Sequence, residues 1–387
     1  AQIALLNDAS GSRGSSIADV RRAKMVERNG DLLATSLTAF TLAADPGKIW
    51  DAREVAQSVA QVLPGVNVDE LTTKLSNSER KYALIRRGLT PRQRQSVMEL
   101  GLEGVYFENE MRRVYPAGRL AGHLLGFTDI DGKGIEGLEY VFDDRLAKGG
   151  EPLRLTIDAS VQYALETELE LASEEYIMAG ATGMVIDAQS GAVRAMASWP
   201  FIDPNHPGRI EQAAKRNRAL TGVFDLGSVY KPLTIAAALD AGAVTPADMF
   251  DVSEPLHFGA ESITDGHEFD YPYAVTVRDI LVYSSNIGAA QIARRLGVAG
   301  HKDFLSRVGL LGRLDYQGPR TQAALPPPRW TELASATVSY GHGIAVTPFA
   351  FAMSYVPLAN GGMYLSPRFA ETEGGPSEEP VRVMSEE

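Results

Sequence analysis

Apolar and polar positions follow regular periods in two parts of the chain, which are separated by the polar linker Lys148–Pro152. Residues 1–24 are polar and are expected to form a loose leading segment. After them, the pattern predicts two extended pieces over 25–34 joined by an Asn-Gly turn, helices over 54–63 and 69–76, a strand over 82–85, a helix from Pro91 to near Gly101, and a strand over 104–115. We therefore expect two modules, 1–150 and 151–387.

The pattern after the linker is more regular. Asp158 is a suitable N-cap, and the apolar residues behind it recur at spacings of four and three, as on one face of a helix: Val161, Leu165, Leu169, Ala172 and Tyr176. Residues 184–197 predict a β-hairpin with its turn at 187–191. Further helices are expected over 276–283, 286–296, 330–340 and 348–359. The acidic end, 371–387, is expected to be poorly ordered.

Composition narrows the class of protein. The 387 residues are 44% hydrophobic and 22% charged, as in soluble globular proteins. A net charge of −12 without a basic stripe argues against nucleic acid as the main partner. The absence of cysteine excludes disulfides and thiol catalysis.

No apolar run approaches the roughly eighteen residues of a membrane span, and the first residues lack the features of a signal peptide. Any anchor is expected to precede Ala1.

The strongest chemical signal is the run Ser228-Val229-Tyr230-Lys231-Pro232, which opens an apolar helical segment. Residues i and i+3 share a helix face, so Lys231 can reach the hydroxyl of Ser228. Pro232 is tolerated in a first turn, which places Ser228 at the helix N-terminus. There the macrodipole favours a neutral lysine and a negative oxygen. A neutral lysine beside a serine can activate a nucleophile without histidine.

Serine and lysine at this spacing also recur by chance, as Ser78 and Lys81 show in a charged segment that we interpret as solvated surface. Unlike that pair, Ser228 has a companion downstream. Ser284-Ser285-Asn286 is the only Ser-x-Asn in the chain, and it opens its own apolar segment. A second serine can relay a proton, and an asparagine can bind a substrate amide. The alternative is structural: Ser284 caps a helix and Asn286 lies in a turn.

Other patterns carry less weight. Gly132–Gly137 spells G-x-G-x-x-G, but no clear strand precedes it, which disfavours a nucleotide loop. Asp129–Gly132 lacks the full spacing of a calcium loop. His257 and His267 lie near acidic residues such as Asp265, without the spacing of a zinc site. Sequence order leaves a Ser-His-Asp triad open, but no histidine is a better partner for the serine than the lysine. We expect no metal and no cofactor.

Longer blocks around these residues resemble the class B penicillin-binding proteins, the peptidoglycan D,D-transpeptidases, and look most like the division-specific FtsI type. The likeness covers nearly the whole chain, and the order of the blocks is more specific than any single block. Besides the Ser228 and Ser284 boxes, the matching blocks are Arg28-Asn29-Gly30, Tyr115–Gly118, Gly122–Gly126, Gly134–Glu139, Leu155–Asp158, Asp203–Asn205, Asn217–Ala219, Tyr340–Gly343, Val346–Pro348 and Ala359–Gly362.

The resemblance implies an α+β multidomain fold. An extended, non-catalytic N-terminal pedestal module would cover 1–150, and a penicillin-binding transpeptidase domain, an antiparallel sheet flanked by helices, would cover 151–387. It also implies a catalytic group and a group of substrate-binding residues. The catalytic group is Ser228, Lys231, Ser284 and Asn286, and the substrate-binding group is Gly227, Tyr230 and Ser285.

The same resemblance implies an activity, partners and a location. Ser228 would be acylated by the D-Ala-D-Ala end of a peptidoglycan stem peptide during septal crosslinking, and β-lactam antibiotics would acylate it too. The N-terminal module would contact divisome membrane proteins. The expected location is the periplasmic face of the bacterial inner membrane, with a single N-terminal anchor outside this sequence.

The chain departs from the family in two places. Asp225 stands where members usually have glutamate, and the family's Lys-Thr-Gly box, expected on a strand after Ala359–Gly362, is not reached before Glu387. Lys148-Gly149-Gly150 is no substitute, because it precedes the nucleophile in a linker. The missing box favours a second hypothesis, a non-catalytic divisome scaffold or fragment. A third, a serine D,D-carboxypeptidase or β-lactamase, is disfavoured by the long module before residue 150.

Overall fold

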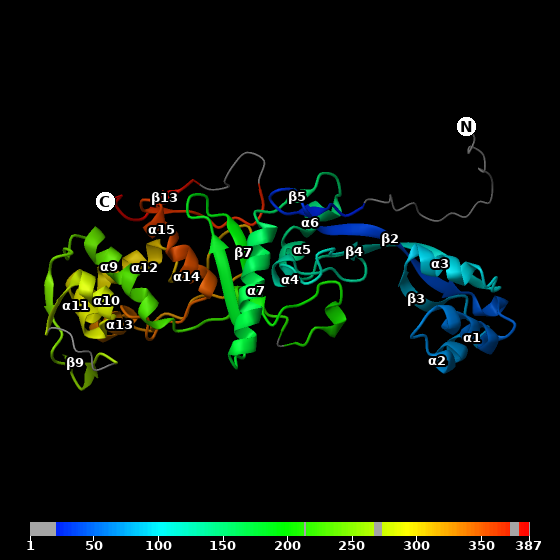
Figure 1. Cartoon of the computed structure of the whole chain (residues 1–387), viewed down its shortest axis with the longest axis horizontal. Coiled ribbons are helices and arrows are strands. Elements are labelled where there is room, and N and C mark those ends of the chain that lie inside the picture. Colours follow the sequence, from blue (N-terminus) through cyan, green and yellow to red (C-terminus); the bar gives the residue numbers. More distant parts are fainter. Residues whose placement is uncertain (1–20, 213, 267–272, 372–378, 387) are drawn as a thin grey trace. The chain divides into compact units, whose positions relative to one another are not determined.

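The computed structural model describes residues 21–212, 214–266, 273–371 and 379–386 (Figure 1). The described chain divides into two compact units. Of the described residues, the first unit comprises 21–24, 36–112 and 144–151, and the second comprises 25–35, 113–143 and those from 152 to 386. Segments 25–35 and 113–143 therefore pack with the second unit, although they precede the linker in sequence. The modules 1–150 and 151–387 stay a prediction.

The first unit is built from short elements around one apolar core. Its helices are α1 (Ala52–Val62), α2 (Val68–Leu75) and α3 (Pro91–Met98), and β3 (Ala83–Leu89) pairs antiparallel with β2 (Leu32–Ala44). The predicted N-cap of α3 is confirmed, because Thr90 and Gln93 form a reciprocal capping box. The predicted helices and strands of this region are confirmed, including β4 (Val105–Val114). The short η1 (Pro46–Lys48) and α6 (Asp143–Ala147) were not predicted.

The early part of the second unit is held by buried polar contacts. The predicted Asn29-Gly30 turn joins β1 (Met25–Val26) to β2, and β5 (Leu153–Arg154) runs parallel to β1. Two short helices follow, α4 (Gly122–Leu125) and α5 (Gly137–Val141). Arg113 Nε donates to Glu139 Oε1 at 2.6 Å, and both side chains are buried. Such a pair holds only while both charges are present, because either one alone would be buried uncompensated.

The Gly-rich segment around residue 132 is a packing motif. A Cβ added at Gly126 would lie 1.9 Å from Glu136 O, and one added at Gly134 would lie 2.0 Å from Glu139 O. Only glycine permits such close backbone approach. Asp129 Oδ1 accepts the backbone N–H groups of Asp131 and Lys133, which closes a local turn.

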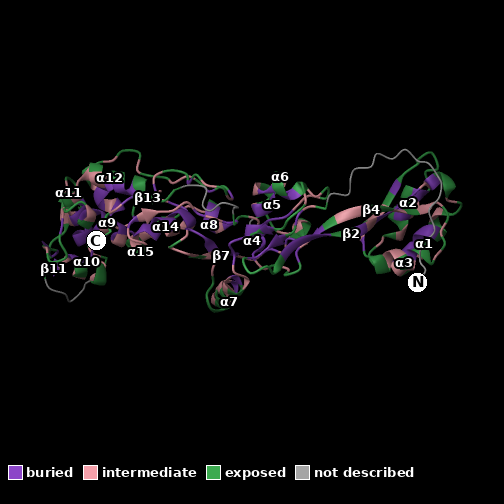
Figure 2. Cartoon of the chain, turned by 90° about the horizontal axis from the view of Figure 1, so that it is seen from above, coloured by how far each residue is buried: buried purple, intermediate pink, exposed green. Residues whose placement is uncertain are grey.

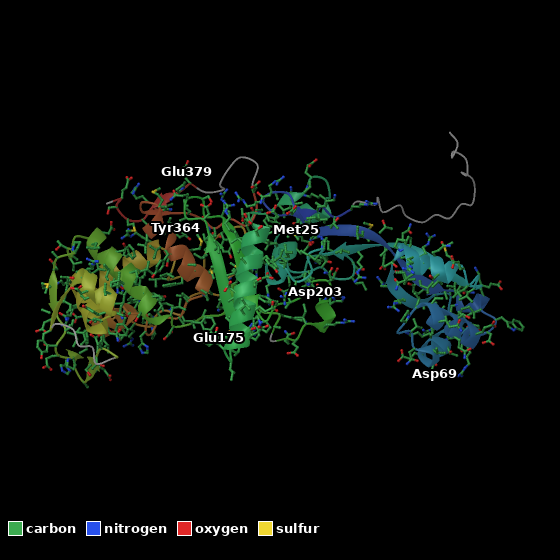
Figure 3. All side chains as sticks on the ribbon, in the orientation of Figure 1. Met25, Asp69, Glu175, Asp203, Tyr364 and Glu379 are labelled. Atoms are coloured by element: carbon green, nitrogen blue, oxygen red, sulfur yellow. The ribbon has the colours of Figure 1, made fainter. Side chains whose placement is uncertain are left out.

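A two-stranded antiparallel sheet and one long helix follow the linker. β6 (Ala181–Ile186) and β7 (Val193–Trp199) form the predicted hairpin, and α7 (Ala159–Glu175) packs against it (Figure 1). Asp158 caps α7 as predicted. Glu175 marks the C-terminal end of this helix in Figure 3.

The fully buried residues of α7 are polar. Its buried residues are Gln162 and Glu166, whereas the predicted apolar stripe is only half-buried and ends in the exposed Tyr176. Gln162 Oε1 accepts from Met196 N at 2.8 Å, and Glu166 Oε1 accepts from Ala121 N at 2.7 Å. These two polar side chains are buried because they satisfy backbone groups of neighbouring segments.

The rest of the second unit is mainly helical. Its apolar core includes the buried residues Ile235, Ile280 and Ile292. Figure 2 shows buried residues interspersed with exposed ones along this helical part of the chain. The helices are η2 (Pro207–Arg209), α8 (Arg218–Thr221), η3 (Gly227–Tyr230), α9 (Lys231–Asp240), α10 (Val277–Tyr283), α11 (Asn286–Leu296), α12 (Val298–Arg307), α13 (Glu332–Val338), α14 (Pro348–Ser354) and α15 (Val356–Ala359). All four helical regions expected after residue 270 are confirmed, and α12 was not predicted.

Small antiparallel strand pairs complete the unit. β8 (Met249–Asp251) pairs with β11 (Ala274–Thr276), β9 (Leu256–Phe258) with β10 (Glu261–Ile263), and β12 (Met363–Tyr364) with β13 (Val381–Arg382). The expectation of poor order at the acidic end was wrong for β13, and Val383 beside it is buried. Residues 1–20 and 372–378, on which the other expectations of disorder fall, lie outside the described residues.

Candidate active site

Ser228 lies in a 3-10 turn, η3, that leads directly into α9. Pro232 stands in the first turn of α9, where its missing N–H has no partner to lose. Gly227, just before the serine, has φ +69°, a conformation that favours glycine. The turn leaves Ser228 exposed, while Leu233 and the face behind it are buried. The structure thus presents the predicted nucleophile to solvent from a firmly packed helix.

The amine of Lys231 lies among four oxygen atoms, although the residue is only 1% exposed. Its Nζ is 2.8 Å from Ser228 Oγ and 2.9 Å from Ser284 Oγ. It donates to Ser284 O at 2.5 Å and to Asn286 Oδ1 at 2.9 Å. The four residues predicted as the catalytic group are therefore brought together around one nitrogen.

This environment makes the amine easier to deprotonate than an ordinary lysine. Burial lowers the pKa of Lys231 from 10.5 to about 8, and the negative charge of Asp265 opposes that shift. The carbonyl oxygens of Ser284 and Asn286 can only accept, so they take the two N–H bonds of a neutral amine. The lone pair then remains for a hydroxyl hydrogen, and Ser228 is within reach to supply it.

Ser284 and Asn286 reach the lysine from the junction between α10 and α11. Ser284 ends α10 with φ +60° and ψ +39°, a left-handed conformation that is uncommon outside glycine. Ser285 then caps α11, and its Oγ accepts from Gly288 N at 2.9 Å. The structural alternative was wrong in its residues, because the N-cap of α11 is Ser285 and Asn286 is the first residue of that helix. The side chains of Ser284 and Asn286 contact the amine instead.

Asp265 is the residue of this site that sequence reasoning missed. It follows β10, and its carboxylate accepts hydrogen bonds from the N-terminus of α11. In the sequence it stands out only as an acidic neighbour of His257 and His267. Asp265 is far from the Ser-x-Asn motif in sequence, and no helix or strand period links the two. Only the contacts in the folded chain show that Asp265 belongs to this site.

The predicted substrate-binding residues lie on the inner side of the nucleophile. Ser285 and Tyr230 are fully buried. The Tyr230 ring packs 4.9 Å from that of Phe351, and burial raises the pKa of the Tyr230 phenol. Gly227 N donates to Gly341 O at 3.3 Å. The structure therefore places these residues where they support the nucleophile turn, and their contact with substrate stays a prediction.

Gly341 has a steric role that its motif did not explain. It has φ +77°, and a Cβ there would lie 2.2 Å from Gly227 O and 2.7 Å from the Tyr230 ring. A side chain at this position must push against the turn that carries Ser228. The match of Tyr340–Gly343 to the family thus has a physical reason in this chain.

The second Ser-x-x-Lys pair and the histidines near acidic residues do not form sites in the described residues. Ser78 is exposed in an irregular stretch between α2 and β3. His257 is exposed on β9, whereas His267 lies outside the described residues. Among the residues that the structure describes, no group of three or more histidine and acidic side chains could hold a metal ion.

Both parts of the chain match known protein families. The penicillin binding protein transpeptidase domain matches residues 181–387, a range that contains the whole Lys231 cluster. This chain belongs to that family. The penicillin-binding protein dimerisation domain matches residues 17–149. The resemblance noted from the sequence, the α+β fold and the pairing of a non-catalytic with a transpeptidase domain are thereby confirmed.

Individual relatives agree with the family. The chain is 37% identical over 369 residues to the probable peptidoglycan D,D-transpeptidase FtsI of Caulobacter vibrioides, covering 94% of this chain and 62% of that protein. It is 28% identical over 378 residues to the peptidoglycan D,D-transpeptidase FtsI of Escherichia coli K12, covering 89% and 63%. The chain thus spans less than two thirds of the length of these curated relatives.

Solved structures of related proteins share the fold. A peptidoglycan synthetase from Bifidobacterium adolescentis superposes with a TM-score of 0.69 at 25% identity, covering 95% of this chain and 78% of that one. Penicillin binding protein 2X from Streptococcus thermophilus superposes with a TM-score of 0.75 at 18% identity, covering 95% and 64%. The arrangement of helices and strands is therefore that of penicillin-binding proteins.

Proposed function

We propose that this chain carries the acylation site of a peptidoglycan D,D-transpeptidase that crosslinks stem peptides during septal wall synthesis. The observation that supports this most strongly is the buried amine of Lys231, which lies within 2.9 Å of the Ser228, Ser284 and Asn286 side-chain oxygens. The catalytic relatives carry the activity in their names, and this chain covers the matching domain. The missing Lys-Thr-Gly box favours the scaffold alternative, but the assembled cluster around Lys231 favours the catalytic proposal over it.

In the first half of the reaction, Ser228 becomes an ester. Its hydroxyl proton passes to the lone pair of Lys231 Nζ while Oγ attacks the carbonyl carbon of the D-Ala-D-Ala peptide bond. The C–N bond then breaks, and the leaving nitrogen takes a proton that Ser284 Oγ relays from Lys231. D-Alanine departs, and the lysine is neutral again. A general base and acid placed in this way typically contribute 10²–10⁴-fold each.

In the second half, an amine from a neighbouring stem peptide attacks the ester carbonyl. The amine loses one proton through Ser284 and Lys231 to the departing Ser228 Oγ, which restores the hydroxyl and leaves a new peptide bond. Asn286 Nδ2 would donate to a substrate amide oxygen, and the backbone N–H of Ser228 would supply one oxyanion donor. β-Lactams would enter by the same first step, because their ring amide presents a comparable carbonyl carbon.

We also propose roles for the rest of the chain. Residues 1–150 would form a non-catalytic module that contacts divisome membrane proteins, and residues 151–387 would carry the chemistry. The matching dimerisation domain and the FtsI relatives support this division of labour. The protein would act at the periplasmic face of the inner membrane. None of the described helices is both long enough and apolar enough to cross a membrane.

Labelling with a fluorescent penicillin tests the proposal. The protein expressed from its complete gene should form a covalent adduct whose mass maps to the peptide containing Ser228. Ser228→Ala should abolish the adduct. Ser78→Ala, the same change in the exposed second Ser-x-x-Lys pair, is the control and should leave the adduct unchanged. Labelling that persists in Ser228→Ala would refute the nucleophile assignment. An adduct that hydrolyses within seconds would instead indicate a hydrolase.

A further inference from the structure

Asp265 binds the start of α11 with both carboxylate oxygens. Its Oδ1 accepts from Asn286 N at 2.5 Å and from Ile287 N at 2.9 Å, and its Oδ2 accepts from Ser285 Oγ at 2.7 Å. The neighbouring Thr264 O accepts from Asn286 Nδ2 at 3.2 Å. A carboxylate at a helix N-terminus satisfies free backbone N–H groups and opposes the positive end of the macrodipole.

These contacts hold a strained turn. Ser284 has positive φ, a conformation that costs a serine free energy and persists only when its surroundings fix it. The turn is fixed from two sides, by Asp265 on the α11 side and by Lys231, which donates to Ser284 O. Without Asp265, the N-terminus of α11 would lose the acceptors of two backbone N–H groups and of the Ser285 hydroxyl.

We propose that Asp265 is a positioning residue for acylation: its carboxylate locks the Ser284–Asn286 turn against Lys231 and keeps a negative charge at the start of α11. This inference rests on the proposed function, because it assigns a role within the same reaction. The contacts described above join Asp265 to Ser285, Asn286 and Ile287, so they act on the lysine through the turn.

The charge argument follows from the groups around the amine. Asp265 raises the pKa of Lys231 against the lowering effect of burial. Ser228, Ser284 and Asn286, which contact Nζ, are uncharged. The adjoining segments carry further titratable groups. Asp225 and Tyr230 belong to the nucleophile turn, and the Tyr355 hydroxyl donates to Val229 O in the same turn. Tyr283 ends α10, Tyr340 and His342 follow α13, and α11 has no charged residue before Arg294. Of these, Asp225 acts on Tyr230.

The test is the pH profile of penicillin acylation, measured with the protein expressed from its complete gene. In the wild type, the rate should rise with pH to a plateau, with its midpoint near the lysine pKa. Asp265→Asn removes the charge but keeps an oxygen that can accept the backbone N–H groups. We expect its midpoint to move down by roughly one pH unit, because the lysine loses a favourable negative charge. Asp265→Ala should also lower the plateau by about 10²-fold through misplacement of the turn.

Asp279→Asn is the matched control. Asp279 closes a capping box with Thr276 at the start of α10, so its loss perturbs the helix that precedes Ser284 without touching the turn. It should leave the midpoint unchanged. If Asp265→Ala does not fold, the midpoint of Asp265→Asn decides alone.

The outcomes separate the two claims. A wild type that never acylates would refute the proposed function. A wild type that acylates, with a midpoint unchanged in Asp265→Asn, would overturn the inference and leave the function standing. An equal shift in Asp279→Asn would also overturn it, because a general loss of negative charge would then explain the effect.

Discussion

Replacing Lys231 with methionine separates what the buried amine costs the fold from what it contributes to chemistry. Methionine has a similar length and an apolar end, so it fills the same space without a charge. The amine is held in a site that disfavours its protonated form, since burial lowers the pKa of Lys231 from 10.5 to about 8. The unfolded chain, in contrast, binds the proton with the ordinary affinity of lysine.

The sign of the pH dependence follows from this difference. Between pH 10.5 and about 8, the unfolded state takes up a proton that the folded state still refuses. The wild type therefore loses stability relative to Lys231→Met as the pH falls through this window, and the difference is constant below it. At 1.36 kcal/mol per pH unit, the free energy of unfolding of the wild type should fall by about 2 to 3 kcal/mol relative to the variant between pH 10 and pH 7.

Urea unfolding of both proteins at pH 7 and pH 10 measures the effect. Lys74→Met, on the exposed surface of α2, is the control and should show no comparable change with pH. Acylation by penicillin at pH 8 should fall roughly 10²–10⁴-fold in Lys231→Met, as expected when a general base is removed. A stability difference that does not change with pH would refute the burial argument, and unchanged acylation would refute the base assignment.

Two further changes test packing, one at the nucleophile turn and one at a buried ion pair elsewhere in the second unit. Gly341→Ala should slow acylation at least tenfold, because the added Cβ would lie 2.2 Å from a carbonyl oxygen of the nucleophile turn. Gly343→Ala is the control, since Gly343 has a similar φ but the nearest atom to an added Cβ is 3.6 Å away. Equal acylation rates in the two variants would contradict the steric argument. Arg113→Met should lower the free energy of unfolding by about 3–5 kcal/mol, because it leaves the Glu139 carboxylate buried without its partner. Arg119→Met, which breaks an exposed pair, should cost about 1 kcal/mol or less in the same thermal or urea titration, and equal losses would refute the burial argument.

The sequence predicted what local chemistry determines. Helix caps such as Thr90 and Asp158, and the apolar periods behind them, located the elements because caps and periods act over a few residues. The convergence of the Ser228 and Ser284 boxes was predicted from their resemblance to a family, since spacing alone also selected the exposed Ser78.

What the sequence did not predict depends on contacts between distant segments. Asp265 acts on a helix that begins twenty-one residues later, and no period marks such a pair. The buried face of α7 was missed because Gln162 and Glu166 are polar residues that are buried only by virtue of their backbone partners. Likewise, β13 became a strand by pairing with β12, in a segment whose acidic composition favoured disorder.

The polar face of α7 has a mechanical consequence. Glu166 accepts one hydrogen bond from Ala121 N and one from Gln162 Nε2, and Gln162 in turn bonds both backbone groups of Met196 on β7. Directional bonds of this kind resist sliding, whereas an apolar contact could slip by a fraction of a turn. A force applied to the chain at Ala121 is therefore transmitted through α7 to the β6–β7 hairpin. These segments should move together as one rigid body.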